Sequence, residues 1–331
     1  MRPSVKTFTF LLFVAALALF PFLGNKFHTY LLSECFIYSV LAISYYMLLG
    51  HTGLMSFGHA ALFGVGAYAS AITLIRFSDL PVSLALVVGG FSGLICGFFI
   101  GLIVLRLKRI YLAFGTLALS QMIWAVAWKW RIVTGGDDGM TGWSSRQVTL
   151  PWLGRFGLIN VTFLYYFVLL FAFACVFLCW YVTRTPFGET LSSIRSNQNR
   201  ADFLGINVSR ARLMVFAFSG FIAGISGGLF ILFKKAAAPT FLDISTSFNI
   251  LVMSVIGGYA SFVGPIVGAF IYVYMMEYLS SFTERWQLVM GAFFVLLILF
   301  YSKGVVGMVE QLTTKVSLFR GKKRGKTTCS S

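Results

Sequence analysis

Side chains that could perform acid–base or nucleophilic chemistry are few in this 331-residue chain. It holds three histidines, His28, His51 and His59, beside ten aspartates and glutamates. A glycine-rich break separates His51 from His59, and no carboxylate lies close in sequence to orient either ring, as a catalytic triad requires. Gly-x4-Gly-Lys-Ser/Thr, the loop that holds nucleotide phosphates, does not occur. The sequence therefore argues against an enzyme, and packing alone could account for each histidine.

Cysteine placement gives no disulfide framework and no metal site. Cys35, Cys96, Cys175 and Cys179 lie in apolar runs, and Cys329 lies in the tail. Cys175 and Cys179 share a helix face, but no histidine or carboxylate stands near them in sequence to complete a ligand set. We interpret these residues as small hydrophobic side chains and expect this chain to bind no metal and no cofactor.

The composition indicates that most of this chain lies in a lipid membrane. Apolar residues make up 58% and charged residues 11%, against ~25% charged in typical soluble domains. The 36 phenylalanines and 33 glycines suit helices that pack closely in a membrane. A soluble enzyme and a disordered chain are excluded. The net charge of +16 fits cytoplasmic loops and anionic lipid better than nucleic acid, because no basic segment carries stacking aromatics.

Long apolar runs predict an all-α, polytopic integral membrane protein. About ten segments can be drawn, and most reach the ~20 residues that a membrane helix needs, although the eighth and tenth are short. A model of eight spans, which merges or discards the short segments, is the main alternative. The segments are 7–24, 28–50, 54–75, 81–105, 110–128, 159–183, 213–233, 244–257, 262–280 and 287–301.

Basic residues orient these spans. With the amino terminus inside, 17 lysines and arginines fall on the cytoplasmic side and nine on the other. Cytoplasmic loops of membrane proteins carry an excess of such residues. We therefore expect a multi-pass protein of the bacterial inner membrane with both termini in the cytoplasm. The whole chain, 1–331, would form one permease domain, with a cytoplasmic loop at 184–212 and a basic cytoplasmic tail at 302–331.

Two similar pentapeptides suggest an internal repeat. Gly53-Leu54-Met55-Ser56-Phe57 follows the second predicted span, and Gly258-Tyr259-Ala260-Ser261-Phe262 follows the eighth. Both would lie at the cytoplasmic end of a span that enters from outside, so we expect two parallel pseudo-repeats. Glycine-broken segments at matching places in two halves are typical of transport pathways, although short matches also arise by chance in glycine-rich sequences.

Polar groups inside the spans are almost all neutral. Ion-coupled transporters use carboxylates or cation sites at mid-membrane, and Glu34 and Glu277 lie near span ends instead. The energy for transport would then come from another protein. A solute pathway is the functional interpretation of the polar and amphipathic residues on or near spans, and helix packing is the alternative for each. These candidates are Ser56, His59, Gln121, Trp124 and Asn249.

The segment 184–212 interrupts the spans with polar and basic residues. Leu191, Ile194 and Leu204 recur at helical spacing, and Gly205 is typical of a helix stop. This pattern predicts a pair of amphipathic cytoplasmic helices. They could lie on the membrane surface or insert into a groove of a soluble partner.

Four blocks in a fixed order resemble one family. The first has LLGHTG at 48–53, SFGHA at 56–60 and FGVGAY at 63–68; the second has RIYLA at 109–113, TLA at 116–118 and TGGDDGMTG at 134–142. The third covers 187–207, and the fourth has VIGG at 255–258 with Ser261, Gly264-Pro265 and Gly268. Together they resemble the LivM-type permeases of bacterial ATP-binding-cassette importers for branched-chain amino acids.

The resemblance implies an assembly. It comprises a second, related permease, two cytosolic ATPases that bind ATP and Mg²⁺, and a periplasmic solute-binding protein. It assigns the third block to the loop that couples the permease to an ATPase, through Glu189, Leu191, Ile194, Arg195, Asn197, Leu204, Gly205 and Asn207. The outer loop departs from the family pattern, in which a serine often precedes the aspartate; here it reads Gly135, Gly136, Asp137, Asp138 and Gly139.

The function expected on this basis is a permease subunit for branched-chain amino acids. Related permeases import urea, short amides or aromatic carboxylates, so the motifs leave the solute open. A secondary transporter or channel that acts alone is the alternative from a different class.

Overall fold

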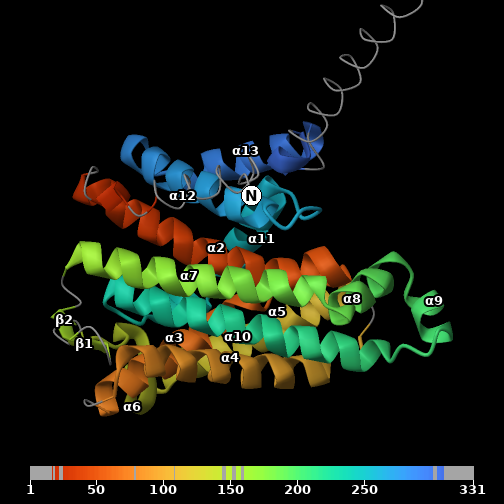
Figure 1. Cartoon of the computed structure of the whole chain (residues 1–331), viewed down its shortest axis with the longest axis horizontal. Coiled ribbons are helices and arrows are strands. Elements are labelled where there is room, and N and C mark those ends of the chain that lie inside the picture. Colours follow the sequence, from red (N-terminus) through yellow and green to blue (C-terminus); the bar gives the residue numbers. More distant parts are fainter. Residues whose placement is uncertain are drawn as a thin grey trace, which may run out of the picture.

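The computed structural model describes residues 17, 19–21, 25–77, 80–107, 109–143, 147–150, 154–157, 160–300 and 304–308. Its long helices run side by side along one axis of the molecule (Figure 1). The predicted span 7–24 and the basic tail lie largely outside the described residues. The helices are α2 Lys26–Thr52, α3 His59–Arg76, α4 Val82–Val104, α5 Arg109–Lys129, α6 Arg131–Thr134, α7 Val161–Arg184, α8 Pro186–Ser196, α9 Gln198–Phe203, α10 Val208–Lys234, α11 Ile244–Gly257, α12 Gly264–Phe282 and α13 Trp286–Phe300, with 3-10 turns η1 Gly136–Asp138 and η2 Pro239–Leu242.

The helical class predicted from the apolar runs is confirmed. Five helices of the described part, α2, α4, α5, α7 and α10, are long and apolar enough to cross a membrane. Nine of the ten predicted segments coincide with a helix, and α11 has the predicted bounds, 244–257. The total of ten spans stays a prediction. One small element was not predicted: β1 (Gln147–Leu150) pairs antiparallel with β2 (Gly154–Gly157).

The centre of the molecule is an antiparallel pair, α2 and α10. The Ser219 hydroxyl donates to the Ser44 carbonyl oxygen at 2.6 Å, and the Ser226 hydroxyl donates to the Ile37 carbonyl oxygen at 2.9 Å. The two contacts are thus seven residues apart on α10 and also seven residues apart on α2. This spacing keeps one seam of each helix in contact over its length. Hydroxyl-to-carbonyl bonds between helices replace water where none is present.

Glycines bring α4 against α10. Gly89, Gly93 and Gly97 recur every fourth residue on α4 and face α10. A Cβ built on Gly93 would lie 2.2 Å from the Gly220 carbonyl oxygen, and one on Gly224 would lie 2.3 Å from the Gly89 carbonyl oxygen. Such distances leave no room for any side chain. The repeat of small residues therefore lets two backbones touch, as is common between membrane helices.

Both central helices are followed by an interruption. Gly53 ends α2 with φ of +69°, and Lys235 ends α10 with φ of +58°. After each, a stretch without α-helix leads into a shorter helix, α3 or α11. Both helices have 27 residues, and they run in opposite directions.

The predicted parallel repeat stays a prediction. The two pentapeptides do lie at the same end of the molecule, because the Arg195 guanidinium contacts both neighbourhoods, at the Gly50 carbonyl oxygen and the Tyr259 ring. They follow α2 and α11.

The two ends of the bundle differ in what they carry. Helices α8 and α9 project at one end, and α6, β1 and β2 lie at the other (Figure 1). The first end is the one that the basic residues assign to the cytoplasm, and we refer to it as the coupling end. The other is the outer end.

Candidate functional site

A polar cluster surrounds the break between α2 and α3. Ser56 is fully buried, and its hydroxyl accepts from the Gly58 amide at 3.3 Å. The Phe57 amide donates to the Thr116 hydroxyl of α5 at 3.0 Å. These side chains satisfy backbone groups that the missing helical turns leave open, which is a requirement for irregular backbone inside a membrane.

His59, the first residue of α3, is buried within this cluster. Its Nε2 lies 2.8 Å from the Ser44 hydroxyl, and the Tyr45 ring contacts it edge-on at 5.2 Å between centroids. Ser44 is eight residues before the end of α2, so α3 begins ~12 Å inside the bundle. No carboxylate pairs with His59 among the described residues, and its Nδ1 has no hydrogen-bond partner there. The arrangement gives no acid–base pair and suits a structural or pathway residue.

The start of α11 meets the start of α3. The Ala60 amide donates to the Ser247 hydroxyl at 3.1 Å, and both groups are buried. Asp243 precedes α11, and its carboxylate accepts from the Ile244 amide at 2.7 Å and from the Ser245 hydroxyl at 2.9 Å. Two helix amino termini, each with a partial positive charge, therefore come together inside the bundle.

Of the five predicted pathway residues, Ser56 and His59 lie at this meeting point. Asn249 is half-buried on α11, two residues beyond Ser247. Gln121 is half-buried on α5, and its side-chain nitrogen has no partner among the described residues. Trp124, one turn further toward the outer end, pairs with Trp128 at 5.3 Å instead of with the polar cluster. The structure thus brings two of the five together and spreads the others along α5 and α11.

The predicted outer loop closes over the second interruption. Gly135, Gly136 and Gly139 have φ of +76°, +62° and +69°, values that favour glycine. A Cβ on Gly139 would lie 2.3 Å from the Ala237 carbonyl oxygen. Met140 and Ala237 form a β-bridge, with N–O distances of 2.7 and 2.8 Å. The glycines therefore fit the loop onto the segment before α11, while the side chains of Asp137 and Asp138 are exposed.

The coupling end has the predicted pair of helices, α8 and α9. Glu189 is exposed in the first turn of α8. The side-chain oxygens of Asn197 and Asn207 cap α9 and α10 by accepting from the Arg200 and Arg210 amides at 3.1 and 3.0 Å. Gly205 has φ of +81°, so the predicted helix stop is confirmed.

Two of the predicted docking anchors need correction. Leu191 and Ile194 are 0% and 2% exposed, because that face of α8 packs on the chain's own membrane helices. They are not available to a partner. Leu204 is 74% exposed, and its neighbour Phe203, which the sequence analysis passed over, is 91% exposed. The apolar surface offered at this end is thus the turn after α9.

Arg195 also has a different place from the one expected. Its guanidinium donates to the Gly50 carbonyl oxygen in the last turn of α2 and stacks over the Tyr259 ring, 5.6 Å from its centroid. Tyr259 lies in the turn between α11 and α12. One side chain of α8 therefore joins the end of α2 to the turn after α11.

Comparison with known proteins identifies the family to which this chain belongs. The family model described as "branched-chain amino acid transport system / permease component" matches residues 28–299. The chain belongs to this family. It is 26% identical to the high-affinity branched-chain amino acid transport permease LivM of Escherichia coli, over 96% of this chain and 78% of that one. No solved structure matches the chain.

Other relatives of this permease differ in their names. It is 27% identical to the probable branched-chain amino acid transport permease LivH of Methanocaldococcus jannaschii, over 66% of this chain and 70% of that one. It is 24% identical to the ribose import permease RbsC of Haemophilus influenzae, over 70% and 71% of the two chains. The permease is thus a multi-pass membrane protein of the ATP-binding-cassette import systems.

Several residues that hold the site and the central helices together were not predicted from the sequence. Ser44, Thr116 and Ser247 are small hydroxyl residues inside apolar runs, where their pattern resembles ordinary packing. Glu34, which is buried, and Lys234, which is partly exposed, form an ion pair with 2.8 Å between charged atoms. The opposite charges near the outer ends of two predicted spans are consistent with an ion pair. They predict it only when α2 and α10 are known to be neighbours.

Proposed function

We propose that this chain is the membrane-spanning subunit through which an ATP-driven importer passes branched-chain amino acids. The observation that carries the proposal is the meeting of the α3 and α11 amino termini inside the bundle. Helix amino termini that meet within a transporter attract anionic groups of a substrate, such as an amino-acid carboxylate. The Phe57 and Phe248 rings, 5.2 Å apart beside the same starts, offer an apolar surface for an aliphatic side chain.

The remaining subunits follow from the family and from the two ends of the bundle. We infer a second, related permease, two cytosolic ATPases that bind ATP and Mg²⁺, and a periplasmic solute-binding protein. Exposed Phe203 and Leu204 would contact an ATPase, and exposed Asp137 and Asp138 lie at the end that a binding protein would approach. This chain would hydrolyse no ATP itself.

The same proposal covers the placement of the chain. It forms one permease domain over 1–331 in the bacterial inner membrane, with the coupling loop 184–212, the basic tail 302–331 and both termini in the cytoplasm. The excess of 17 basic residues over nine supports this orientation.

Reconstitution into liposomes tests the function. The chain, a LivH-type permease, both ATPases and the binding protein should take up labelled leucine only when ATP is supplied on the ATPase side. Excess isoleucine or valine should compete, whereas urea, acetamide or benzoate should not. Competition by one of these three alone would replace the solute but keep the importer. Proton-driven uptake by the lone chain would overturn the importer itself.

A further inference from the structure

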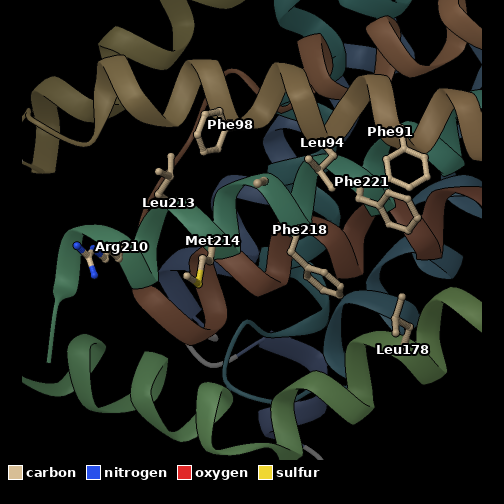
Figure 2. Close-up of a pocket in the computed structure, with 10 residues that line it drawn as sticks. Phe91, Leu94, Phe98, Leu178, Arg210, Leu213, Met214, Phe218 and Phe221 are labelled. Carbon is tan, nitrogen blue, oxygen red and sulfur yellow. The ribbon is translucent and has the colours of Figure 1, made fainter.

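An apolar groove opens between three helices of the coupling half. Its volume is 530 Å³, within the ~300–1,000 Å³ typical of ligand sites. Figure 2 shows α4 along one side, α7 along the other and α10 between them. The walls are apolar side chains except at one end, where Arg210 stands. The lining residues are Phe91, Leu94, Phe98, Leu178, Arg210, Leu213, Met214, Ala217, Phe218 and Phe221.

The groove has the length of one membrane leaflet. Along α10 it extends from Arg210 to Phe221, eleven steps along the helix, which corresponds to ~16 Å at the rise of an α-helix. Half of a typical hydrocarbon core is ~15 Å. At the deep end the Phe91 and Phe221 rings meet edge-on, 5.6 Å between centroids. The groove therefore begins at the membrane surface and ends near the middle of the bilayer.

Its open end is basic. Each of the three helices that form the groove carries an arginine where it reaches the coupling end: Arg106 after α4, Arg184 at the end of α7, and Arg210 in α10. All three are exposed, and Arg184 stacks over Trp180 at 5.7 Å. Within the described part of the chain, none of the three forms an ion pair. These charges have no counter-ion from the protein there.

We propose that this groove binds one anionic phospholipid of the cytoplasmic leaflet, with an acyl chain along α10 and its phosphate at Arg210. A soluble solute would not fit, because the walls offer no polar group below the rim. A phospholipid matches on all three counts: apolar walls, the depth of a leaflet and a basic rim. Basic sites between membrane helices on the cytoplasmic side are typical of anionic lipid binding.

Mass spectrometry of the intact, full-length chain tests the proposal. The protein is purified in mild detergent and offered equal amounts of dioleoylphosphatidylglycerol and dioleoylphosphatidylcholine. We expect one lipid to remain bound, with phosphatidylglycerol preferred by about tenfold, since one charge-assisted hydrogen bond can supply such a ratio. Equal retention of the two lipids would overturn the proposal.

Two variants distinguish the part of the groove that would bind the acyl chain from the part that would bind the headgroup. Ala217→Trp fills the groove at its middle and should remove the retained lipid. Arg210→Gln should keep the acyl chain but reduce the preference for phosphatidylglycerol by about tenfold. The matched control is Ala292→Trp on the exposed face of α13, which lies across the bundle from α4 (Figure 1) and should change nothing.

Folding and assembly are checked separately. Thermal midpoints of the variants show whether each still folds, and Arg210→Gln, an exposed substitution, keeps the proposal testable if Ala217→Trp does not fold. Retention of the same lipid by the assembled importer supports the site. Loss of the lipid on assembly would mean that a neighbouring subunit fills the groove, and retention by Ala217→Trp equal to the wild type would mean that the lipid binds elsewhere; either result overturns the proposal.

Discussion

At the scale of residues, this permease places its few polar groups where the backbone or a partner charge requires them. Ser56, Thr116 and Ser247 each accept from a backbone amide at the interruptions. Glu34 is buried in α2 with the Lys234 ammonium as its partner. Such groups are costly to bury alone, so each is paired. These pairs hold the interruptions and the central helices together, whereas Nδ1 of His59 and the side-chain nitrogen of Gln121 have no partner among the described residues.

Removal of one member of the Glu34–Lys234 pair should be harmful. Lys234→Met leaves the Glu34 carboxylate, only 4% exposed, without its cation. We expect a loss of about 1–3 kcal/mol in the free energy of unfolding, less than for a fully buried pair because Lys234 is 35% exposed. Thermal unfolding in detergent measures it.

The control is Lys235→Met, the neighbouring exposed lysine, which should change stability by less than ~0.5 kcal/mol. The double variant Glu34→Gln with Lys234→Met should recover most of the loss, because no unpaired charge remains. If the double variant is less stable than Lys234→Met alone, the ion pair does not stabilise the fold in the manner described.

At the scale of elements, the contact of α4 with α10 depends on glycine. Gly93→Ala would place a methyl group 2.2 Å from the Gly220 carbonyl oxygen, so the helices must separate. We expect a destabilisation of about 1–3 kcal/mol. Gly291→Ala on α13 is the matched control: nothing lies within 4 Å of its Cβ, and the change should stabilise by about 0.5–1 kcal/mol through helix propensity. Thermal midpoints of the same sign for both variants would contradict the packing argument.

Two substitutions at the coupling end should distinguish binding of the ATPase from its coupling to uptake. Leu204→Asp changes the exposed turn that would contact an ATPase, whereas Arg195→Ala removes the contact of α8 with α2 and Tyr259. We expect Leu204→Asp to lose co-purified ATPase. Arg195→Ala should retain the ATPase and lose ATP-driven uptake by about tenfold, the effect of one charge-assisted hydrogen bond.

Arg200→Ala on the exposed α9 serves as the control and should leave both measurements unchanged. If Arg195→Ala takes up solute as the wild type does, its contact with the two helix ends has no part in coupling.

The sequence predicted elements better than contacts. Spans could be drawn because the apolar runs are long, and Gly205 could be identified as a helix stop because only its own conformation matters. Leu191 and Leu204 have the same residue type on one predicted helical face, yet the first is buried and the second exposed. Asn197 starts a new helix between them and changes the direction of that face. The spacing of the apolar residues alone does not predict this change in direction.

At the scale of the whole molecule, α2 and α10 form the centre, and each end of the bundle holds a different contact. The Glu34–Lys234 ion pair joins these helices near the outer end. Arg195 joins α2 to the turn after α11 at the coupling end. Alternating access requires one end to open while the other stays closed. A transport cycle of the proposed importer would therefore break and remake these two contacts in turn, with the ATPases acting on the end that carries α8.

This scheme depends on which end faces the cytoplasm, and cysteine labelling decides that. Asp138 and Asn199 are exposed: Asp138 lies shortly after α6, and Asn199 lies in α9, at the opposite end of the bundle (Figure 1). The basic residues assign the end with α9 to the cytoplasm. In a Cys329→Ser background, Asp138→Cys should react with a membrane-impermeant maleimide in intact cells. Asn199→Cys should react only in inside-out vesicles, and the background protein, whose remaining cysteines lie within α2, α4 and α7, in neither. Labelling of Asn199→Cys from outside would reverse the orientation and place the exposed Phe203–Leu204 turn beyond the reach of any cytosolic ATPase.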